Sequence, residues 1–368
     1  MKNKKIVHLI TGLDVGGAET VLVKILPRMQ ERFDQSVCCI RGRGSMAKKI
    51  QALGIPVHFL DLRHWYDIRV IYRFYKIVCK ANPDLLMTHL IHADLFGRIL
   101  GKLFGIKNIV SCVVVKLIQK KYVPLLLLEK LTSPLVDRYI CNSPVVADFY
   151  TSRLNIPKRK VSMIPNGIEL DAYSYHVDIP KIKHELGIPS NRFVIGCMAQ
   201  FRKQKNYPVL IRAFAQVRNT YPDAFLVLIG DGEQRVTIER LIAEYGIEKH
   251  VSLPGGTRTD VYEMLSAMDI FVLPSSYEGM SYALQQAMVS RIPCIVSNIP
   301  ENTVLIQHGI TGLVFENDNS QSLAHQILSL IRKDDLKRSI AASAKKEIEQ
   351  HYDIRKTTAQ LLKIIQTT

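Results

Sequence analysis

The sequence has no apolar run long enough to span a bilayer. The longest, residues 122–128, is interrupted by Pro124 and flanked by charged residues, whereas a transmembrane helix needs about 20 apolar residues. The basic start of the chain runs into a short apolar stretch and a glycine-rich turn without a small-residue cleavage site, so we interpret it as a first strand rather than a leader. We therefore expect a cytoplasmic protein.

Signatures of disulfide, metal and nucleophile chemistry are also missing. The seven cysteines are odd in number and have no zinc-ligand spacing, which predicts buried thiols in a reducing compartment. The adjacent Cys38 and Cys39 would point to opposite faces of a strand. No DxD motif follows a strand, and neither HExxH nor a G-x-S-x-G elbow is present. We expect no metal ion and no cofactor.

No tract of biased composition interrupts the chain of 368 residues. Apolar residues make up 47% and charged residues 22%, with 20 Gly and 16 Pro, which excludes disordered, collagen-like and coiled-coil classes. The length is about twice that of a usual domain, so two domains are expected, each large enough to bury its own core.

Positive charge is concentrated in the first half. Residues 1–170 hold 27 Lys and Arg against 12 Asp and Glu, whereas residues 171–368 hold 22 against 21. A basic half can face nucleic acid, an anionic membrane or acidic small molecules. The first half shows no RNP-like strand, zinc finger or Arg-rich arm, so we expect no nucleic-acid partner.

Short β-branched runs alternate with helical patterns along the whole chain. This alternation predicts parallel sheets built from βαβ units. A segment rich in Pro, Asn, Gly and Asp separates two such series near residue 170, so two doubly wound α/β domains follow. The predicted strands are Ile6–Ile10, Ser36–Ile40, Val57–Leu60, Leu85–His89, Asn108–Val114, Arg138–Asn142, Phe193–Met198, Phe225–Ile229, His250–Leu253, Ile270–Leu273, Cys294–Ser297 and Gly312–Phe315.

The segment Asp269–Met288, "DIFVLPSSYEGMSYALQQAM", carries the strongest chemical signal. An apolar strand ends at Leu273, and a helix is predicted to begin near Ser281 after a tight loop. Free N–H groups at the start of that helix would suit a phosphate. Glu278 in the loop would then be placed to touch a sugar or to counter positive charge at an anomeric carbon. The alternative is that Glu278 is a solvated loop residue.

This segment resembles the signature of retaining glycosyltransferases of family 4, which reads roughly E-G-x-[PS]-x-x-x-x-E-A-M. Glu278, Gly279 and Ser281 match it, as do the Ala and Met that close it. Gln286 replaces the second Glu, which in the family holds the nucleotide ribose. The resemblance implies the GT-B fold of two facing Rossmann-like domains with a C-terminal crossover helix.

Other family-like segments extend over nearly the whole chain. "TGLDVGGAE" after the first strand resembles the family's glycine loop, in which Gly16 and Gly17 let the backbone approach the donor phosphate; the alternative is an ordinary tight turn. "SMIPNGIEL" and "HGITGLVF" are similar to family elements. We predict an acceptor-side domain at 1–170, joined by a last helix at about 352–368, and a nucleotide-sugar domain at 171–351.

Basic residues follow the first strand of the second half. In the family, an Arg and a Lys there contact the donor diphosphate and stabilise the leaving group. Lys205 matches the Lys, while Gln200 stands in place of the Arg and Arg202 lies close by. Without the resemblance, this loop would be interpreted as solvated surface.

Residues on the acceptor side are assigned from the first half. The family places a His after the fifth strand, where this chain has Val114. The segment "MTHLIHADLFGR" is similar to an acceptor-side element and points to His89, His92 and Asp94. The alternative for His89 is a strand-end side chain that is hydrogen-bonded to a neighbouring loop.

The resemblance implies a metal-independent, retaining glycosyltransferase that uses a nucleotide sugar and a glycan or lipid-linked acceptor, as in bacterial polysaccharide or lipopolysaccharide synthesis. The altered Val114, Gln200 and Gln286 leave open a degenerate member that binds without efficient catalysis. Glu278 and Lys205 are the predicted catalytic residues. The predicted donor contacts are Gly16, Gly17, Gln200, Arg202, Gly279, Met280, Ser281, Tyr282, Ala283, Leu284 and Gln286.

Two further expectations concern helices. Basic and apolar residues interleave over Val113–Lys130 as in an interfacial helix, so we expect contact with an anionic membrane, on the inner face of the plasma membrane. The alternative is an ordinary helix whose leucines pack on the sheet. The last helix, from Tyr352, is expected to cross back to the first domain, as in resembling proteins.

Overall fold

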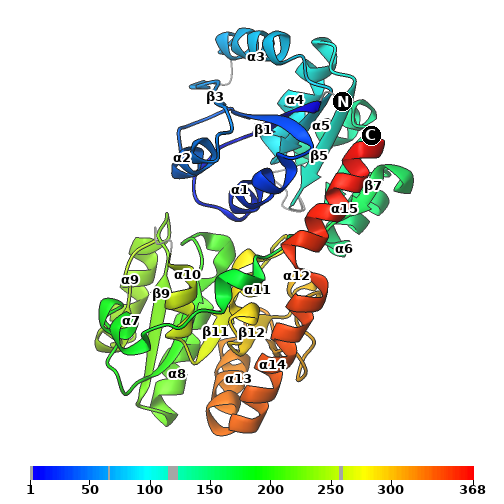
Figure 1. The fold of residues 1–368 in the computed structure, drawn as a ribbon. Coiled ribbons are helices and arrows are strands. Elements are labelled where there is room, and N and C mark those ends of the chain that lie inside the picture. Colours follow the sequence, from blue (N-terminus) through cyan, green and yellow to red (C-terminus); the bar gives the residue numbers. More distant parts are fainter. Residues whose placement is uncertain (1–2, 65–66, 115–122, 257–259) are drawn as a thin grey trace. The chain divides into compact units, whose positions relative to one another are not determined.

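Parallel strands form the centre of both halves of the chain in the computed structural model, which describes residues 3–64, 67–114, 123–256 and 260–368. The chain divides into unit 1, which is Met1–Gly167 with Ile354–Thr368, and unit 2, which is Ile168–Asp353 (Figure 1). Unit 1 has a seven-stranded sheet and unit 2 a six-stranded sheet. The predicted α/β class with two doubly wound parallel sheets is confirmed.

In unit 1 the strand order is β3-β2-β1-β4-β5-β6-β7. Its elements are β1 Lys4–Ile10, α1 Gly17–Met29, β2 Phe33–Cys39, α2 Ser45–Ala52, β3 Val57–Phe59, α3 Arg69–Ala81, β4 Leu85–His89, α4 Ile91–Leu103, β5 Asn108–Val113, α5 Val123–Thr132, η2 Ser133–Leu135, β6 Arg138–Cys141, α6 Pro144–Asp148, η3 Phe149–Arg153, η4 Lys158–Lys160, β7 Val161–Met163 and α15 Ile354–Thr367.

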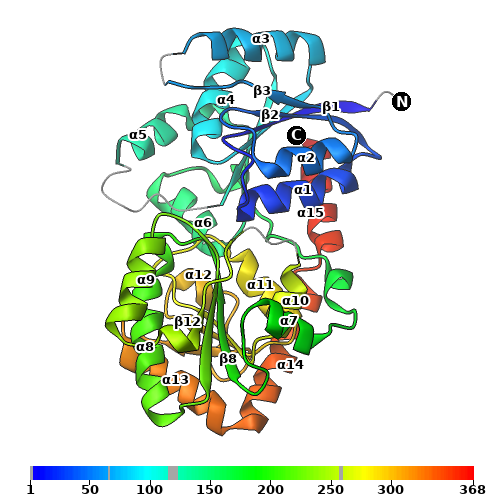
Figure 2. The same ribbon diagram turned by 90° about the vertical axis from the view of Figure 1, so that its left-hand side faces the viewer.

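The two faces of this sheet carry different helices. Apolar side chains of α1, α2 and α15 form one buried cluster with the sheet, and those of α3 and α4 form another on the opposite face, where α5 packs beside α4 (Figure 2). Cys38 and Cys39 belong to opposite clusters, because successive strand side chains alternate.

In unit 2 the strand order is β10-β9-β8-β11-β12-β13. Its elements are η5 Leu170–Tyr173, α7 Ile179–Glu185, β8 Phe193–Met198, η6 Lys203–Lys205, α8 Tyr207–Thr220, β9 Ala224–Ile229, α9 Arg235–Glu244, η7 Glu248–His250, β10 Val251–Ser252, α10 Val261–Ser266, β11 Ile270–Leu273, α11 Tyr282–Val289, β12 Cys294–Ser297, α12 Pro300–Thr303, β13 Leu313–Phe315, α13 Ser320–Arg332 and α14 Asp334–His351.

The last helix, α15, belongs to unit 1 and packs against α1 (Figure 2). Ile354, Leu361 and Ile365 are buried in the unit 1 core. The chain leaves unit 1 at Gly167, where an added Cβ would lie 2.4 Å from the Ile354 Cα atom. A side chain there would clash with backbone, so glycine lets the outgoing and returning segments pass closely.

Candidate active site

The strand order of unit 2 brings two predicted loops together. β8 and β11 are neighbours in the sheet, although β9 and β10 separate them in sequence. The chain adds β9 and β10 on one side of β8 and then β11 to β13 on the other side, so the strand order reverses between β8 and β11. Ligands of open parallel sheets bind at such a reversal, outside the carboxyl ends of the strands. The loop after β8 contains Lys205 and the loop after β11 contains Glu278.

These two predicted catalytic residues form an ion pair. Lys205 Nζ lies 2.5 Å from Glu278 Oε1, and the two side chains are 16% and 7% exposed. The Ser275 hydroxyl donates a second hydrogen bond of 2.7 Å to the same oxygen. The alternative of a solvated loop carboxylate is therefore wrong.

Backbone contacts hold the two loops against each other. The Ser276 N–H donates to the Gln204 carbonyl at 2.9 Å, and the Gln204 side-chain amide donates to the Tyr277 carbonyl at 3.3 Å. Ser297 is the last residue of β12, and its hydroxyl donates a hydrogen bond of 2.5 Å to the Ser275 carbonyl. Sequence reasoning missed Gln204 and Ser275 as supports, because the contacts join segments far apart in the chain.

Helix α11 begins immediately after this loop. Ser281 is its N-cap, and the Ser281 hydroxyl accepts from the Leu284 N–H at 3.3 Å. The expectation that the Leu284 N–H is free for an anion is therefore wrong in this structure, because the cap occupies it. The neighbouring predicted donor contacts share the site: Gly279, Met280 and Tyr282 are buried and Ala283 is half-buried.

Gln286 lies one turn further along α11. Its side-chain amide donates to the Tyr173 hydroxyl at 2.7 Å, and both side chains are below 10% exposed. Burial raises the pKa of Tyr173 to about 12. The sequence offered no signal for Tyr173, which lies in the Pro-, Asn-, Gly- and Asp-rich segment between the two predicted domains.

The remaining predicted donor residues of unit 2 lie after β8. Gln200 is half-buried and Arg202 is exposed. The Arg202 N–H donates to the Gln200 carbonyl at 2.8 Å, so the two residues share one turn. Arg202 is thus close in the chain to the position of the missing Arg.

In unit 1, Gly16 and Gly17 join β1 to α1. Gly16 is the N-cap of α1 in an extended conformation, and an added Cβ at Gly17 would meet no atom within 4 Å. Neither residue has a positive φ. The fold of the unit therefore does not itself require glycine at Gly17, which fits a position reserved for a close ligand.

His89 ends the neighbouring strand β4, beyond the strand-order reversal between β1 and β4. Its Nε2 lies 3.3 Å from Nδ1 of His8, on the adjacent strand rather than on a loop. Burial lowers the pKa of His8 to about 4 and that of His89 to about 3. Leu90 follows with φ 72°, a strained conformation that costs about 1–3 kcal/mol and is common near functional sites. His92 is exposed.

Asp94 lies inside a buried ionic cluster. It accepts a hydrogen bond of 2.5 Å from Thr88 and is 3.9 Å from Arg98, which is itself 2.7 Å from Glu129. The side chains of Arg98 and Glu129 are fully buried, and that of Asp94 is 2% exposed. Burial raises the pKa of Asp94. No surface of Asp94 is available to an acceptor, so it acts as a structural residue in this structure.

A small cavity of about 70 Å³ lies between α1, α15 and the carboxyl ends of β4 to β6. Its lining includes His89 and Val114. Asn142 Oδ1 and Thr358 Oγ1 also border it, and both are buried without a hydrogen-bond partner in the described part of the chain. The volume accommodates about two water molecules at roughly 30 Å³ each, and water would satisfy both oxygens.

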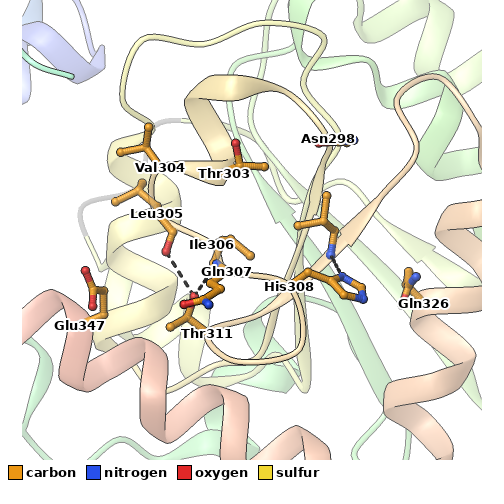
Figure 3. A pocket seen from close by; sticks show the side chains of 11 residues that line it. Asn298, Thr303, Val304, Leu305, Ile306, Gln307, His308, Thr311, Gln326 and Glu347 are labelled. Atoms are coloured by element: carbon orange, nitrogen blue, oxygen red, sulfur yellow. Dashed lines mark hydrogen bonds between the residues drawn. The ribbon is translucent and has the colours of Figure 1, made fainter. Parts of the chain in front are cut away.

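A wider cavity of about 830 Å³ in unit 2 contains no predicted site residue (Figure 3). Its walls are mostly uncharged, and hydrogen bonds close the turn before β13. The Val314 N–H donates to His308 Nδ1 at 2.9 Å, and the Gln307 N–H donates to the Thr311 hydroxyl at 2.8 Å (Figure 3). The family-like "HGITGLVF" segment therefore comprises this turn and the edge strand β13.

Among the described residues, no group of three His, Cys, Asp or Glu side chains could hold a metal ion. No helix within the described ranges is long and apolar enough to cross a membrane.

Cys79 is exposed on α3, which contradicts the expectation that the cysteines are buried thiols.

Two doubly wound units, one with a lysine–glutamate ion pair at its strand-order reversal, define the class of two-domain nucleotide-sugar transferases. Residues 15–172 match the family described as Glycosyltransferase Family 4, and residues 178–347 match Glycosyl transferases group 1. The chain belongs to the glycosyltransferases of family 4. It transfers a sugar from a nucleotide-diphosphate sugar to an acceptor hydroxyl with retention.

Three similar proteins illustrate the relationship. An Escherichia coli UDP-Gal:alpha-D-GlcNAc-diphosphoundecaprenol alpha-1,3-galactosyltransferase is 27% identical over 340 residues, 88% of this chain and 87% of that protein. The lipopolysaccharide core biosynthesis glycosyltransferase LpsD of Rhizobium meliloti is 25% identical over 96% of both chains. The structure of Anabaena HepE in complex with UDP and glucose is similar in fold, with a TM-score of 0.89, 20% identity and full coverage of both chains.

Proposed function

We propose that unit 2 binds a UDP-sugar at the loops after β8 and β11 and transfers the sugar to a lipid-linked glycan bound by unit 1. The converging contacts of Lys205, Glu278 and Ser275 carry this proposal. The structures of Anabaena HepE with UDP and with UDP-glucose support the choice of nucleotide. The diphosphoundecaprenol acceptor named for the Escherichia coli relative supports a lipid-linked acceptor.

Lys205 supplies positive charge to the leaving diphosphate. An ammonium group stabilises a departing phosphate most when it is preorganised in a water-poor site, and Lys205 is mostly buried and already held in place. The N-terminus of α11, with no acidic residue in its first turn, adds partial positive charge nearby. No metal ion is needed for this role.

Glu278 contacts the donor sugar. Lys205 and Ser275 both bind Oε1 of its carboxylate, so Oε2 is the oxygen that we assign to a sugar hydroxyl. Gln286, held by Tyr173, contacts the nucleotide ribose. In unit 1 we assign Gly16 and Gly17 to donor-phosphate contacts, and His89 and His92 to the acceptor. We omit Asp94 from the acceptor site because it is buried.

The decisive experiment separates binding from transfer. Glu278→Ala is expected to abolish sugar transfer and leave UDP binding nearly intact, because the carboxylate faces the sugar. Lys205→Ala is expected to weaken UDP binding by about 1.5–3 kcal/mol, the value of a hydrogen bond to a charged group. Titration calorimetry with UDP and a radiolabelled transfer assay measure the two effects.

Two variants control this experiment. Lys203→Ala removes an exposed lysine from the same short helix and is expected to change neither quantity. Glu278→Gln keeps an oxygen that can accept the hydrogen bond from Ser275. A loss of transfer in this variant therefore cannot be attributed to a missing Ser275 contact that would unfold the loop. If Lys205→Ala binds UDP as tightly as wild type, or Glu278→Ala and Glu278→Gln both transfer sugar at the wild-type rate, the assignment is wrong.

The proposed location is the inner face of the plasma membrane, where a lipid-linked acceptor would be presented. The net charge of residues 1–170 supports this, because basic surfaces attract anionic lipids.

A further inference from the structure

Helix α5 buries a charged side chain and exposes apolar ones, which is the reverse of an ordinary surface helix. Its charged Glu129 is fully buried against Arg98, whereas Leu127, Leu128 and Leu131 are 60%, 46% and 66% exposed. A surface helix normally turns its apolar side chains to the core. Here the buried ion pair accompanies an orientation in which these three leucines face outward.

This orientation overturns the alternative in which these leucines pack on the sheet. Of the α5 side chains, only Leu126 packs against the buried apolar cluster around β6. The expected interfacial segment was Val113–Lys130, of which residues 115–122 lie outside the described residues. The inference therefore rests on α5 and its described neighbours.

The two helices beside α5 show the same feature. Of the 17 large apolar side chains that are exposed in the described part of the chain, ten lie on α5, on α4 or on α3 and its N-cap. We call these ten side chains the α3–α5 face. They are Ile68, Ile71, Tyr72, Tyr75, Ile99, Leu103, Val123, Leu127, Leu128 and Leu131. The Tyr75 ring lies 5.2 Å from that of Phe104, which links α3 to the end of α4.

The charges on these helices are of one sign at the surface. α3 has no acidic residue, and the acids of α4 and α5, Asp94 and Glu129, are both buried. Lys76, Lys80 and Lys130 are exposed. Three further cations have acidic neighbours outside the helices: Arg69 binds Asp67, Arg73 lies near Asp61 and Lys102 binds Asp137.

We propose that the α3–α5 face docks on an anionic lipid bilayer. Exposed leucines, isoleucines and tyrosines among lysines are the composition of an interfacial surface, where apolar groups enter the headgroup region and cations bind anionic lipids. The proposal rests on the proposed function only for its purpose, which is to bring unit 1 to a lipid-linked acceptor.

Charge argues against a second copy of the chain as the occupant. Unit 1 holds 30 Lys and Arg against 11 Asp and Glu, a net charge of +19, whereas unit 2 holds 19 against 22, a net charge of −3. Two copies that met through this face would bring two strongly positive units together, which like-charge repulsion opposes. A bilayer with negative lipids has the complementary charge.

Vesicle flotation without donor tests the proposal. Wild type is expected to float with vesicles of phosphatidylglycerol and phosphatidylcholine, and much less with phosphatidylcholine alone. The double variant Leu127→Ser/Leu131→Ser is expected to lose about tenfold in partitioning, because it removes apolar area that would enter the lipid. Both leucines are exposed, so thermal unfolding is expected to remain close to that of wild type.

The matched control is Val236→Ser on α9 of unit 2, where Val236 is 77% exposed; it is expected to float like wild type. Equal flotation of the double variant and wild type, or no preference for anionic vesicles, overturns the proposal. So does light scattering that shows a wild-type dimer and a monomeric double variant. Donor hydrolysis measured without vesicles tests the proposed function separately, so either idea can fail alone.

Discussion

At the scale of single residues, Gln286 is a substitution whose effect can be measured. Its amide donates to Tyr173, whereas a glutamate would accept from the Tyr173 hydroxyl and keep its other oxygen for ribose hydroxyls. Hydrogen bonds to charged groups contribute more than neutral ones. Gln286→Glu is therefore expected to tighten UDP-sugar binding about fivefold, roughly 1 kcal/mol, and Gln200→Arg should add to this.

Titration calorimetry measures this change. Gln307→Glu, at an exposed glutamine of the same unit, is the control and should leave the affinity unchanged. Weaker binding by Gln286→Glu would show that the ribose does not lie at this position. If wild type binds no nucleotide sugar and the Gln200→Arg/Gln286→Glu variant does, the substitutions have impaired the site.

The buried pair His8 and His89 predicts a pH dependence of stability. Burial lowers both pKa values, to about 4 and about 3, so below pH 6.5 the unfolded chain binds protons that the folded chain does not. Stability is therefore lost as the pH falls from 6.5 towards 4. Glu129 acts in the opposite sense, because burial raises its pKa, and a group whose pKa is raised on folding contributes stability that is lost as the pH rises.

His89→Gln removes one of the two histidines that take up a proton on unfolding. In urea unfolding between pH 5 and 6, the stability of this variant should rise less steeply with pH than that of wild type, by about 1.4 kcal/mol per pH unit. His92→Gln, at an exposed position of the following helix, should keep the wild-type slope. An unchanged slope in His89→Gln would mean that His89 titrates equally in both states.

At the scale of elements, α15 shows how the end of the chain completes unit 1. Ile365 is 1% exposed within the core that α1 and the sheet also form. Ile365→Ala is expected to cost about 2–5 kcal/mol, because the removed methyl groups leave a cavity. Urea unfolding measures this loss, and Lys363→Ala on the exposed side of the same helix should cost little. Equal stability of the two variants would show that α15 is not needed for the core.

The strands show how far the sequence predicts the fold. Leu85–His89, Phe193–Met198 and Ile270–Leu273 form with the predicted ends, because buried parallel strands are continuous apolar runs. β7, Val161–Met163, was not predicted; it has three residues, none of them buried, so it leaves no apolar run. The Gln204, Ser275 and Tyr173 contacts also escaped prediction, because they depend on tertiary packing between distant segments.

The orientation of α5 stayed open at the level of sequence for a related reason. The interleaved basic residues favour an interfacial helix, whereas the leucine run by itself also fits a buried one. The outcome depends on Arg98, which lies on another helix and pairs with Glu129 in the interior. A buried charge is very costly without its partner, so this one pair outweighs the tendency of the leucines to turn inward.

At the scale of the whole molecule, the charge is divided unevenly. Unit 2 has a net charge of −3, so its overall field does not attract an anionic nucleotide. Affinity must come from local groups, and Lys205 with the N-terminus of α11 supplies them. These groups are fixed parts of the protein, whereas a metal ion would have to bind together with the nucleotide.

Binding and transfer are therefore expected to be independent of divalent cations. UDP at about 100 times its dissociation constant should stabilise the chain by about 2.7 kcal/mol, with the same shift in unfolding temperature in EDTA as in Mg²⁺. Sugar transfer should likewise continue in EDTA. Lys205→Ala serves as the matched comparison, since it should lose most of the UDP-induced shift in both buffers. Loss of the shift or of transfer in EDTA, with recovery on adding Mg²⁺ or Mn²⁺, would show that Lys205 and the helix terminus do not neutralise the diphosphate by themselves.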